Sequence, residues 1–214
     1  MTARDQILGD IRTALGRAGH ARPAPLNAPL LRNPRTARNL FVPLFVRNFE
    51  KLAGKVFVVP SPAAVAPVLR ELLQAKQAVA SNAPFLKDCG IGDFEQIRSG
   101  FTDRDELRRA CASADVGISS VDYALAETGS FVMFSSHDEA RLISLLPPAH
   151  VAIIPRSKIL ANLDELLATV PKPAERSGSM VLITGGSRTA DIEQILIRGV
   201  HGPGEVYAVV VEDV

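Results

Sequence analysis

Short apolar runs alternate with amphipathic helical patterns along most of the chain. The runs contain few polar residues, so they lack the apolar–polar alternation of a strand with one exposed face. A strand that is apolar throughout is typical of a parallel sheet covered by helices on each side. The pattern therefore predicts a three-layer α/β fold with a mostly parallel sheet, whose strands are residues 55–59, 77–80, 115–119, 129–134, 150–154, 180–184 and 206–211.

The segments between these runs show helical spacing of apolar residues. Phe41, Phe45 and Phe49 recur every four residues in one amphipathic helix, and Pro62 stands where another helix begins. Asp103 and Glu106 form the pattern of a capping box at the start of the next helix. We also expect helices over residues 159–167 and 192–196, and a short helical link before residue 129.

The first 38 residues differ from the rest. Ile7, Ile11 and Leu15 share one face of an N-terminal helix that Thr2 and Asp5 are placed to cap. Residues 20–34 contain four prolines and little periodicity, which is typical of an extended arm. The sequence therefore predicts a helix and Pro-rich arm at residues 1–38 and one α/β domain at residues 39–214. The helix is expected to dock on a neighbouring subunit, on a partner or on its own domain.

Composition limits the classes of function. The chain has 214 residues, 47% hydrophobic and 22% charged, which suits one folded domain with a sizeable core. Its formal net charge of +1 and its lack of Trp argue against a nucleic-acid surface or an anionic membrane as partner. No apolar segment approaches the roughly 18 residues of a bilayer span, and the charged first 19 residues do not resemble a signal peptide. We expect a soluble, cytoplasmic protein.

Cysteine and histidine indicate no metal site. Cys89 and Cys111 are the two cysteines, and neither belongs to a C-x-x-C motif or a Cys/His cluster. The four histidines also lack metal-ligand spacing. We expect no zinc, no iron–sulfur cluster and no bound cofactor in this chain, and two small apolar side chains in a reducing compartment.

The first candidate site follows the apolar run at residues 115–119. Glu127 stands immediately before Thr128 and Gly129, where a tight turn leads into the next run. Gly129 lets the backbone approach a ligand closely, and Glu127 can serve as a nucleophile, a general base or a hydrogen-bond acceptor. Asp122 is a further candidate ligand-binding residue in this segment. The alternative is that Glu127 only caps or pairs locally.

The second candidate site follows the run at residues 180–184, where two glycines lead into an expected helix. Main-chain N–H groups at a helix N-terminus, together with an arginine, favour a phosphate or a carboxylate. The segment lacks the motifs of a Walker A loop and of a dinucleotide-binding turn. The alternative is a glycine turn capped by Ser187 or Thr189. The residues proposed to bind the anion are Gly185, Gly186, Ser187, Arg188, Thr189 and Asp191.

His201 and Arg141 are the remaining candidate site residues. His201 lies between glycines before the last run, where an imidazole can act as an acid, a base or a donor to an oxyanion. The alternative is a turn in which the imidazole bonds a backbone carbonyl. Arg141 follows the run at residues 129–134 and can point into the same cleft. His150 opens a buried run and is expected to be a packed core histidine.

Three of these segments resemble a known family. Residues 115–129 (DVGISSVDYALAETG), residues 141–148 (RLISLLPP) followed by His150, and residues 187–203 (SRTADIEQILIRGVHGP) are similar to the lactate utilization protein C family, the LUD-domain proteins. The resemblance runs from about residue 55 to the C-terminus. Gly186 stands where the family usually has proline, and Arg198 stands where an apolar residue is commoner.

The resemblance implies a fold and a setting. Members have a three-layer α/β fold similar to that of 5-formyltetrahydrofolate cyclo-ligase and the CoA-transferases. They are encoded with two iron–sulfur partner proteins, and together these support oxidation of L-lactate to pyruvate. Glu127 is similar in placement to the nucleophilic glutamate of the related CoA-transferases, although Thr128 replaces the usual asparagine.

Three hypotheses follow. In the first, the chain is a non-redox subunit of a lactate-oxidising iron–sulfur complex and binds a small carboxylate or phosphate-bearing ligand through Arg188 and the amides after Gly185. Glu127, Asp191 and His201 would shape that pocket. In the second, the chain is an autonomous acyl- or nucleotide-using enzyme with Glu127 as nucleophile or base. In the third, it is an assembly module without a ligand of its own.

Overall fold

The computed structural model describes residues 2–16, 36–189 and 197–212. The chain divides into two compact units, Met1–Leu31 and Arg32–Val214. The first unit contains helix α1 (Ala3–Ala14), which Thr2 and Asp5 cap reciprocally: each side chain accepts a hydrogen bond from the other residue's main-chain N–H. The Thr2 hydroxyl and the Thr2 main-chain N–H both donate to the Asp5 carboxylate, and these two bonds lower the pKa of Asp5. The capping box predicted for α1 is thus confirmed.

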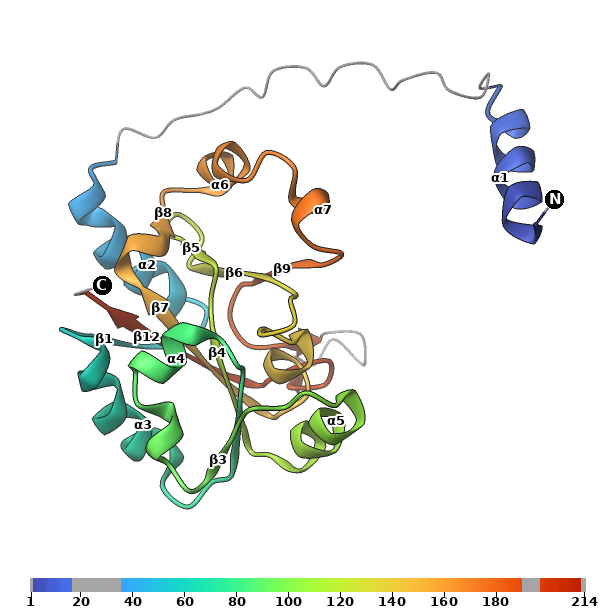
Figure 1. Cartoon of the computed structure of the whole chain (residues 1–214). Coiled ribbons are helices and arrows are strands. Elements are labelled where there is room, and N and C mark those ends of the chain that lie inside the picture. The colour runs from blue at the N-terminus through green and yellow to red at the C-terminus, as the bar shows by residue number, and fades with distance from the viewer. Residues whose placement is uncertain (1, 17–35, 190–196, 213–214) are drawn as a thin grey trace. The chain divides into compact units, whose positions relative to one another are not determined.

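Six strands of the described residues form a parallel sheet in the second unit (Figure 1). In spatial order they are β1 (Lys55–Val59), β12 (Glu205–Val211), β7 (Ala149–Pro155), β4 (Val116–Ser120), β2 (Ala78–Ala80) and β3 (Ile97–Arg98). Every neighbouring pair in this sheet is parallel. The predicted α/β class with a mostly parallel sheet is therefore confirmed, and β3 is an addition to the predicted strands.

A second sheet lies beside the first and was not expected from the apolar pattern. It contains β8 (Ile159–Leu160), β5 (Tyr123–Leu125), β6 (Ser130–Phe134) and β9 (Met180–Ile183), and β6 pairs antiparallel with both β5 and β9. The prediction of parallel strands at residues 129–134 and 180–184 is therefore wrong. The reason is that β6 is also buried on both faces, so its sequence resembles that of a parallel strand.

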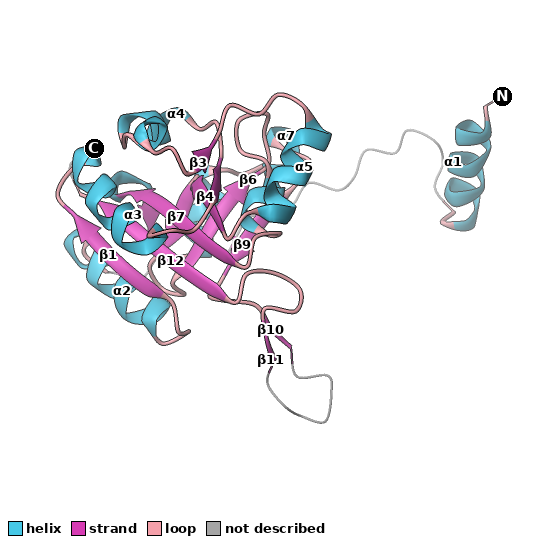
Figure 2. Ribbon diagram, turned by 90° about the horizontal axis from the view of Figure 1, so that it is seen from below, coloured by secondary structure: helices cyan, strands magenta, loops and turns pink. Residues whose placement is uncertain are grey.

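Helices cover both faces of the parallel sheet (Figure 2). α3 (Val65–Leu73) and α4 (Pro84–Asp88) pack on one face, whereas α2 (Phe41–Glu50) and α5 (Arg104–Ser113) pack on the other. α6 (Leu163–Thr169) packs on the outer face of the second sheet through Leu166. The remaining helices are α7 (Pro173–Arg176) and the 3₁₀ helices η1 (Arg38–Leu40), η2 (Pro62–Ala64), η3 (Ile91–Asp93), η4 (Arg141–Ser144) and η5 (Arg156–Lys158).

Two local predictions need correction, and a third concerns residues that the structure does not describe. Asp103 caps α5 by accepting the N–H of Glu106 at 2.7 Å, but the Glu106 carboxylate bonds Arg98 at 3.2 Å and does not complete a capping box. The expected helical link before residue 129 is strand β5 and a turn. The expected helix at residues 192–196 lies outside the described residues, and the segments flanking it, β10 (Arg188–Thr189) and β11 (Ile197–Arg198), pair antiparallel.

One close contact holds η4 against the parallel sheet. A Cβ atom added to Gly117 of β4 would lie 1.9 Å from the main-chain oxygen of Ile143 in η4. Only a glycine allows this approach of two backbones. Gly117 therefore fixes the position of η4, which begins with Arg141.

Replacing Gly117 by alanine should destabilise the domain, because η4 must then move away from β4. Forced shifts of this kind cost about 1–3 kcal/mol. Denaturant unfolding followed by circular dichroism measures the change in the free energy of unfolding. Gly92→Ala is the matched control, since a Cβ atom at Gly92 meets open space. Equal unfolding midpoints for the two variants would contradict this account.

Candidate functional site

The turn between β5 and β6 carries the first set of predicted site residues. Asn48 of α2 donates hydrogen bonds to the carbonyls of Ala126 at 2.9 Å and Glu127 at 2.8 Å. Gly129 has φ +63, and a Cβ atom there would lie 2.5 Å from the main-chain nitrogen of Phe49. The close backbone approach expected at Gly129 is thus made by α2.

A chain of hydroxyl groups links this turn to the end of β9. The Ser130 hydroxyl lies 2.7 Å from that of Thr128 and 2.8 Å from that of Thr184. The segments after residues 115 and 180 therefore meet, as the sequence predicts for the two candidate regions. Among the described residues, no hydrogen bond or ion pair engages the exposed Glu127 carboxylate.

The residues predicted to bind an anion after β9 contact other parts of the domain. The Arg188 guanidinium donates to the carbonyl of Leu52, which follows α2. The Ser187 amide donates to the carbonyl of Pro203 at 2.8 Å and so is not presented to a ligand, contrary to the expected loop of open amides. Gly185 has φ +81 and lies against Leu52, and Gly186 lies against Gly204.

The remaining residues of that set lie on or near a projecting hairpin. Thr189 pairs with Ile197 in the β10–β11 ladder, which extends away from the body of the domain (Figure 2). Asp191 lies outside the described residues. His201 is exposed, and its main-chain N–H reaches the Ser187 hydroxyl at 3.4 Å.

These residues gather at the amino edge of the parallel sheet. His201 precedes β12, and Gly204 donates to the carbonyl of Pro148, which precedes β7. Ligands of open parallel sheets usually bind at the opposite, carboxyl edge. The sequence predicts the loop after β9 at the carboxyl edge because it predicts β9 as a strand of the parallel sheet. β9 instead pairs antiparallel with β6 in the second sheet, so its end lies elsewhere.

The Asp122 carboxylate is bound by other groups of the protein. Its Oδ2 accepts the N–H of Phe134 at 2.7 Å, and its Oδ1 pairs with Arg176. The Arg176 guanidinium lies 4.2 Å from the centre of the Phe134 ring, so it covers the ring while neutralising the carboxylate. Both Asp122 oxygens are thus occupied within the second sheet and α7.

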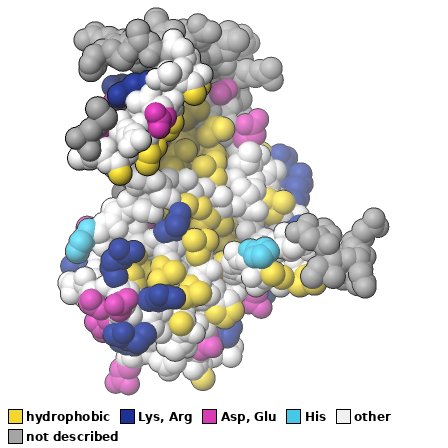
Figure 3. All heavy atoms as spheres, turned by 90° about the vertical axis from the view of Figure 1, so that its right-hand side faces the viewer, with side chains coloured by type: hydrophobic (Ala, Val, Ile, Leu, Met, Phe, Trp, Pro, Cys, Tyr) yellow, Lys and Arg dark blue, Asp and Glu magenta, His cyan; other side chains and the backbone are white. Residues whose placement is uncertain are grey.

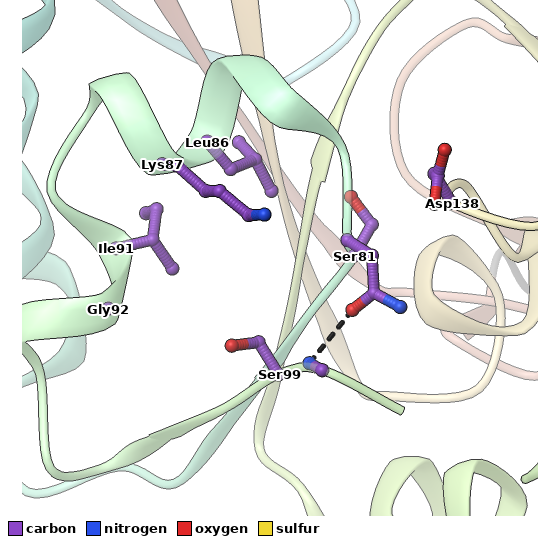
Figure 4. Close-up of a pocket in the computed structure, with 9 residues that line it drawn as sticks. Ser81, Leu86, Lys87, Ile91, Gly92, Ser99 and Asp138 are labelled. Atoms are coloured by element: carbon purple, nitrogen blue, oxygen red, sulfur yellow. Dashed lines mark hydrogen bonds between the residues drawn. The ribbon is translucent and has the colours of Figure 1, made fainter. Parts of the chain in front are cut away.

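A cavity of about 540 Å³ lies at the carboxyl ends of β2 and β3 (Figure 4). Sequence analysis did not select it, although Ser81 and Asn82 directly follow one apolar run and are the signal that marks it. Figure 4 shows the Lys87 amino group directed toward the middle of the cavity, with Ser81 across from it. The lining residues are Ser81, Asn82, Leu86, Lys87, Ile91, Gly92, Ser99, Gly100 and Asp138. We call this space the strand-end cavity.

Asn82 fixes the walls of the strand-end cavity. Its side chain accepts the N–H of Gly100 at 2.8 Å and donates to the carbonyl of Phe101 at 2.9 Å. Its own N–H donates to the carbonyl of Asp138 at 2.8 Å. Asn82 therefore joins the end of β3 through its side chain and the segment after β6 through its main chain, so the cavity is formed before a ligand arrives.

Glu139 is buried behind Ser81. Its Oε2 accepts hydrogen bonds from the Ser81 hydroxyl at 2.7 Å and the Ser120 N–H at 3.2 Å, while Oε1 has no partner among the described residues. Burial raises the pKa of Glu139 to about 8, and the two hydrogen bonds oppose this only in part. The carboxyl group is therefore predominantly neutral at pH 7.

Arg141 lies at another cleft. Its guanidinium is exposed and donates to the Ser179 hydroxyl at 3.3 Å. A cleft of about 980 Å³ runs between this residue and α5. Arg141 therefore does not join Glu127 and Arg188, which lie near the C-terminal end of α2.

The other buried polar groups belong to the core. His150 is fully buried, bonds the Ser119 hydroxyl at 2.7 Å, and has its pKa lowered to about 4 by burial, so it is neutral, which confirms the predicted core histidine. Cys89 and Cys111 are free and buried, and burial raises their pKa values to about 12 and about 11. Thiols with such pKa values are poor nucleophiles and metal ligands.

The described residues form neither a metal site nor a membrane-spanning helix. No group of three or more His, Cys, Asp or Glu side chains in residues 2–16, 36–189 and 197–212 is arranged to hold a metal ion. Within the same ranges, no helix has the length and apolarity required to cross a membrane.

The fold and the sequence together define the family. The sequence model of the LUD domain matches residues 42–211, and the chain belongs to this family. A crystal structure of a DUF162 family protein from Deinococcus radiodurans shares the fold, with a TM-score of 0.64 and 20% identity over 82% of this chain and 99% of that one.

Several relatives bear the name lactate utilization protein C. The one from Halalkalibacterium halodurans is 35% identical over 158 residues, which is 70% of this chain and 68% of the relative. Those from Bacillus licheniformis and Exiguobacterium are 38% and 41% identical over 51% and 50% of this chain. The match spans about half the length of these two relatives, 47% and 48%.

Glu139→Gln should change the dependence of stability on pH. The folded protein binds the Glu139 proton more tightly than the unfolded chain, so the stabilisation present below pH 4.5 is lost as the pH rises to about 8. The variant has no such titration. Its free energy of unfolding relative to the parent should rise across that interval by on the order of a few kcal/mol.

Denaturant unfolding at a series of pH values measures this difference. Glu95→Gln controls for the loss of an exposed carboxylate. Parallel pH profiles for E139Q and the parent protein would show that Glu139 is ionised in the folded state.

Proposed function

We propose that this chain acts in lactate utilization as a cytoplasmic, non-redox component that binds a small carboxylate. A role in lactate utilization is supported by the name of the relatives, one of which is 35% identical over 70% of this chain. Electrons from lactate would pass through separate iron–sulfur partner proteins. The burial of both cysteine thiols supports this division, because neither is presented as a cluster ligand.

The observation that carries the carboxylate site is the direction of Lys87. Its amino group points into the strand-end cavity, and no described residue forms an ion pair with it (Figure 4). An ammonium group that faces a cavity and forms no ion pair attracts an anionic ligand. The Asp138 carboxylate also lines the cavity, where it lies 3.5 Å from His137 Nδ1. Leu86 and Ile91 line the same cavity and suit the apolar part of a small organic acid.

Ser81 adds selectivity for a hydroxyl group. Its hydrogen is donated to Glu139, so its lone pairs remain to accept a hydrogen bond from a ligand. A 2-hydroxy acid carries both a carboxylate for Lys87 and a hydroxyl donor for Ser81. L-Lactate belongs to this chemical class.

Lys87→Met should weaken L-lactate binding by about tenfold, since it removes a charge-assisted contact at a partly solvated site. Isothermal titration of L-lactate into the full chain measures the dissociation constant. Lys51→Met is the matched control, because Lys51 is also exposed and lies outside the cavity. The proposed site fails if L-lactate does not bind the parent chain, or if both variants bind it equally.

A second function, an autonomous acyl- or nucleotide-using enzyme, is favoured by one observation. Asn48 holds the main chain of Glu127 rigidly while the carboxylate stays exposed, as a nucleophile or base requires. Glu127→Gln distinguishes the two functions: it leaves L-lactate affinity unchanged if the strand-end cavity is the site. If the variant folds normally but loses an acyl- or nucleotide-using activity that the parent chain has, Glu127 is supported as the catalytic group. If the variant keeps every activity of the parent chain, a binding or assembly role remains.

Tagged full-length chain, recovered from its native cytosol, should bring iron–sulfur proteins with it. Purified chain alone should not reduce a dye acceptor in the presence of L-lactate, because the electron carriers are then absent. Mass spectrometry and visible absorption of the recovered material provide the measurement. Oxidation of lactate by the chain alone would rule out the division of labour proposed here.

A further inference from the structure

A cleft separate from the strand-end cavity carries unpaired positive charge. Arg104 and Arg108 lie one turn apart on α5, and Arg141 lies on the opposite wall at the start of η4. Figure 3 views the side that carries α5 and shows several Lys and Arg side chains beside a hydrophobic patch. The cleft has a volume of about 980 Å³. We call it the arginine cleft.

The arginines of this cleft have no anionic partner among the described residues. The guanidinium groups of Arg104 and Arg108 make no hydrogen bond or ion pair there, and that of Arg141 bonds only the neutral Ser179 hydroxyl. Two carboxylates, Asp103 and Asp105, also line the cleft, so its three guanidinium groups stand against two carboxylates. The cleft therefore keeps an excess of positive charge.

The surroundings strengthen the attraction of this cleft for anions. Phe101 is buried, and Leu107, Leu142 and Leu145 are half-buried along its lining. An apolar wall lowers the local dielectric constant and so increases the interaction between opposite charges. The hydroxyl groups of Ser135 and Ser136 also line the cleft and can bond phosphate or carboxylate oxygens.

The chain's own arm is not a suitable occupant. Residues 17–35 contain four arginines and no Asp or Glu, so they repel the cleft. A ligand must instead be anionic. The guanidinium groups come from two elements, α5 and η4, so a ligand with two or more anionic groups can engage both elements at once.

We propose that the arginine cleft binds a small polyanion, a molecule with two or more phosphate or carboxylate groups. Guanidinium groups recognise both kinds of group through paired N–H donors. A ligand with a single carboxylate, such as lactate, has no second anionic group for the other element, so we expect this site and the strand-end cavity to take different ligands. The arginine cleft thus gives the chain a second ligand-binding site.

Isothermal titration of inorganic pyrophosphate and of citrate into the full-length chain tests the proposal. Arg108→Gln should weaken the binding of the preferred anion by about tenfold, and the Arg104→Gln, Arg108→Gln double variant should weaken it further. Arg109→Gln is the matched control, because Arg109 lies on the same helix outside the cleft and should leave affinity unchanged. Added salt should weaken binding in the parent chain.

Each outcome has a defined meaning. Binding of pyrophosphate alone supports a phosphate ligand, and binding of citrate alone supports a polycarboxylate. Binding of neither anion overturns the proposal, as does an equal loss in the Arg108 and Arg109 variants. Binding of polyglutamate without either small anion also overturns it, and would point to an acidic protein segment. Lys87→Met should retain pyrophosphate or citrate binding and Arg108→Gln should retain lactate binding, so the two sites succeed or fail separately.

Discussion

The packing of three phenylalanine rings joins the two sheets. Phe45 and Phe49 of α2 stack with their centres 5.6 Å apart, and Phe131 of β6 lies 6.0 Å and 5.0 Å from them. All three side chains are fully buried. Aromatic pairs at these distances contribute beyond the area that they bury. The cluster therefore helps to fix the second sheet on the parallel sheet, together with the buried contacts of Ala124 and Met133.

That cluster also determines where polar groups gather. Since Phe49 holds β6 against α2, the turn at Gly129 lies on the α2 backbone and Asn48 reaches its carbonyls. The Glu127 turn, Arg188 and the loop of His201 consequently lie at the amino edge of the parallel sheet. The strand-end cavity lies at the carboxyl edge, where parallel strands present their ends to ligands.

The sequence predicts the parallel sheet well because its strands are apolar on both faces. The run at residues 55–59 matches β1 residue for residue. The Thr128 and Thr184 segments meet for a reason that the sequence does not reveal, because antiparallel pairing sets the start of β6 beside the end of β9. The sequence does not predict the second sheet, because β6 is as fully buried as the strands of the parallel sheet. The strand-end cavity escapes it because Ser81 and Glu139 are 58 residues apart, and only the fold brings them to 2.7 Å.

Glu139 also changes what folding exchanges with the solvent. With a pKa of about 8, this carboxyl holds a proton at neutral pH that the unfolded chain releases. The formal net charge of +1 counts Glu139 as ionised, so the folded chain carries one negative charge fewer. Calorimetric heats of unfolding near neutrality consequently include the ionisation enthalpy of whichever buffer accepts that proton, and they differ between phosphate and Tris.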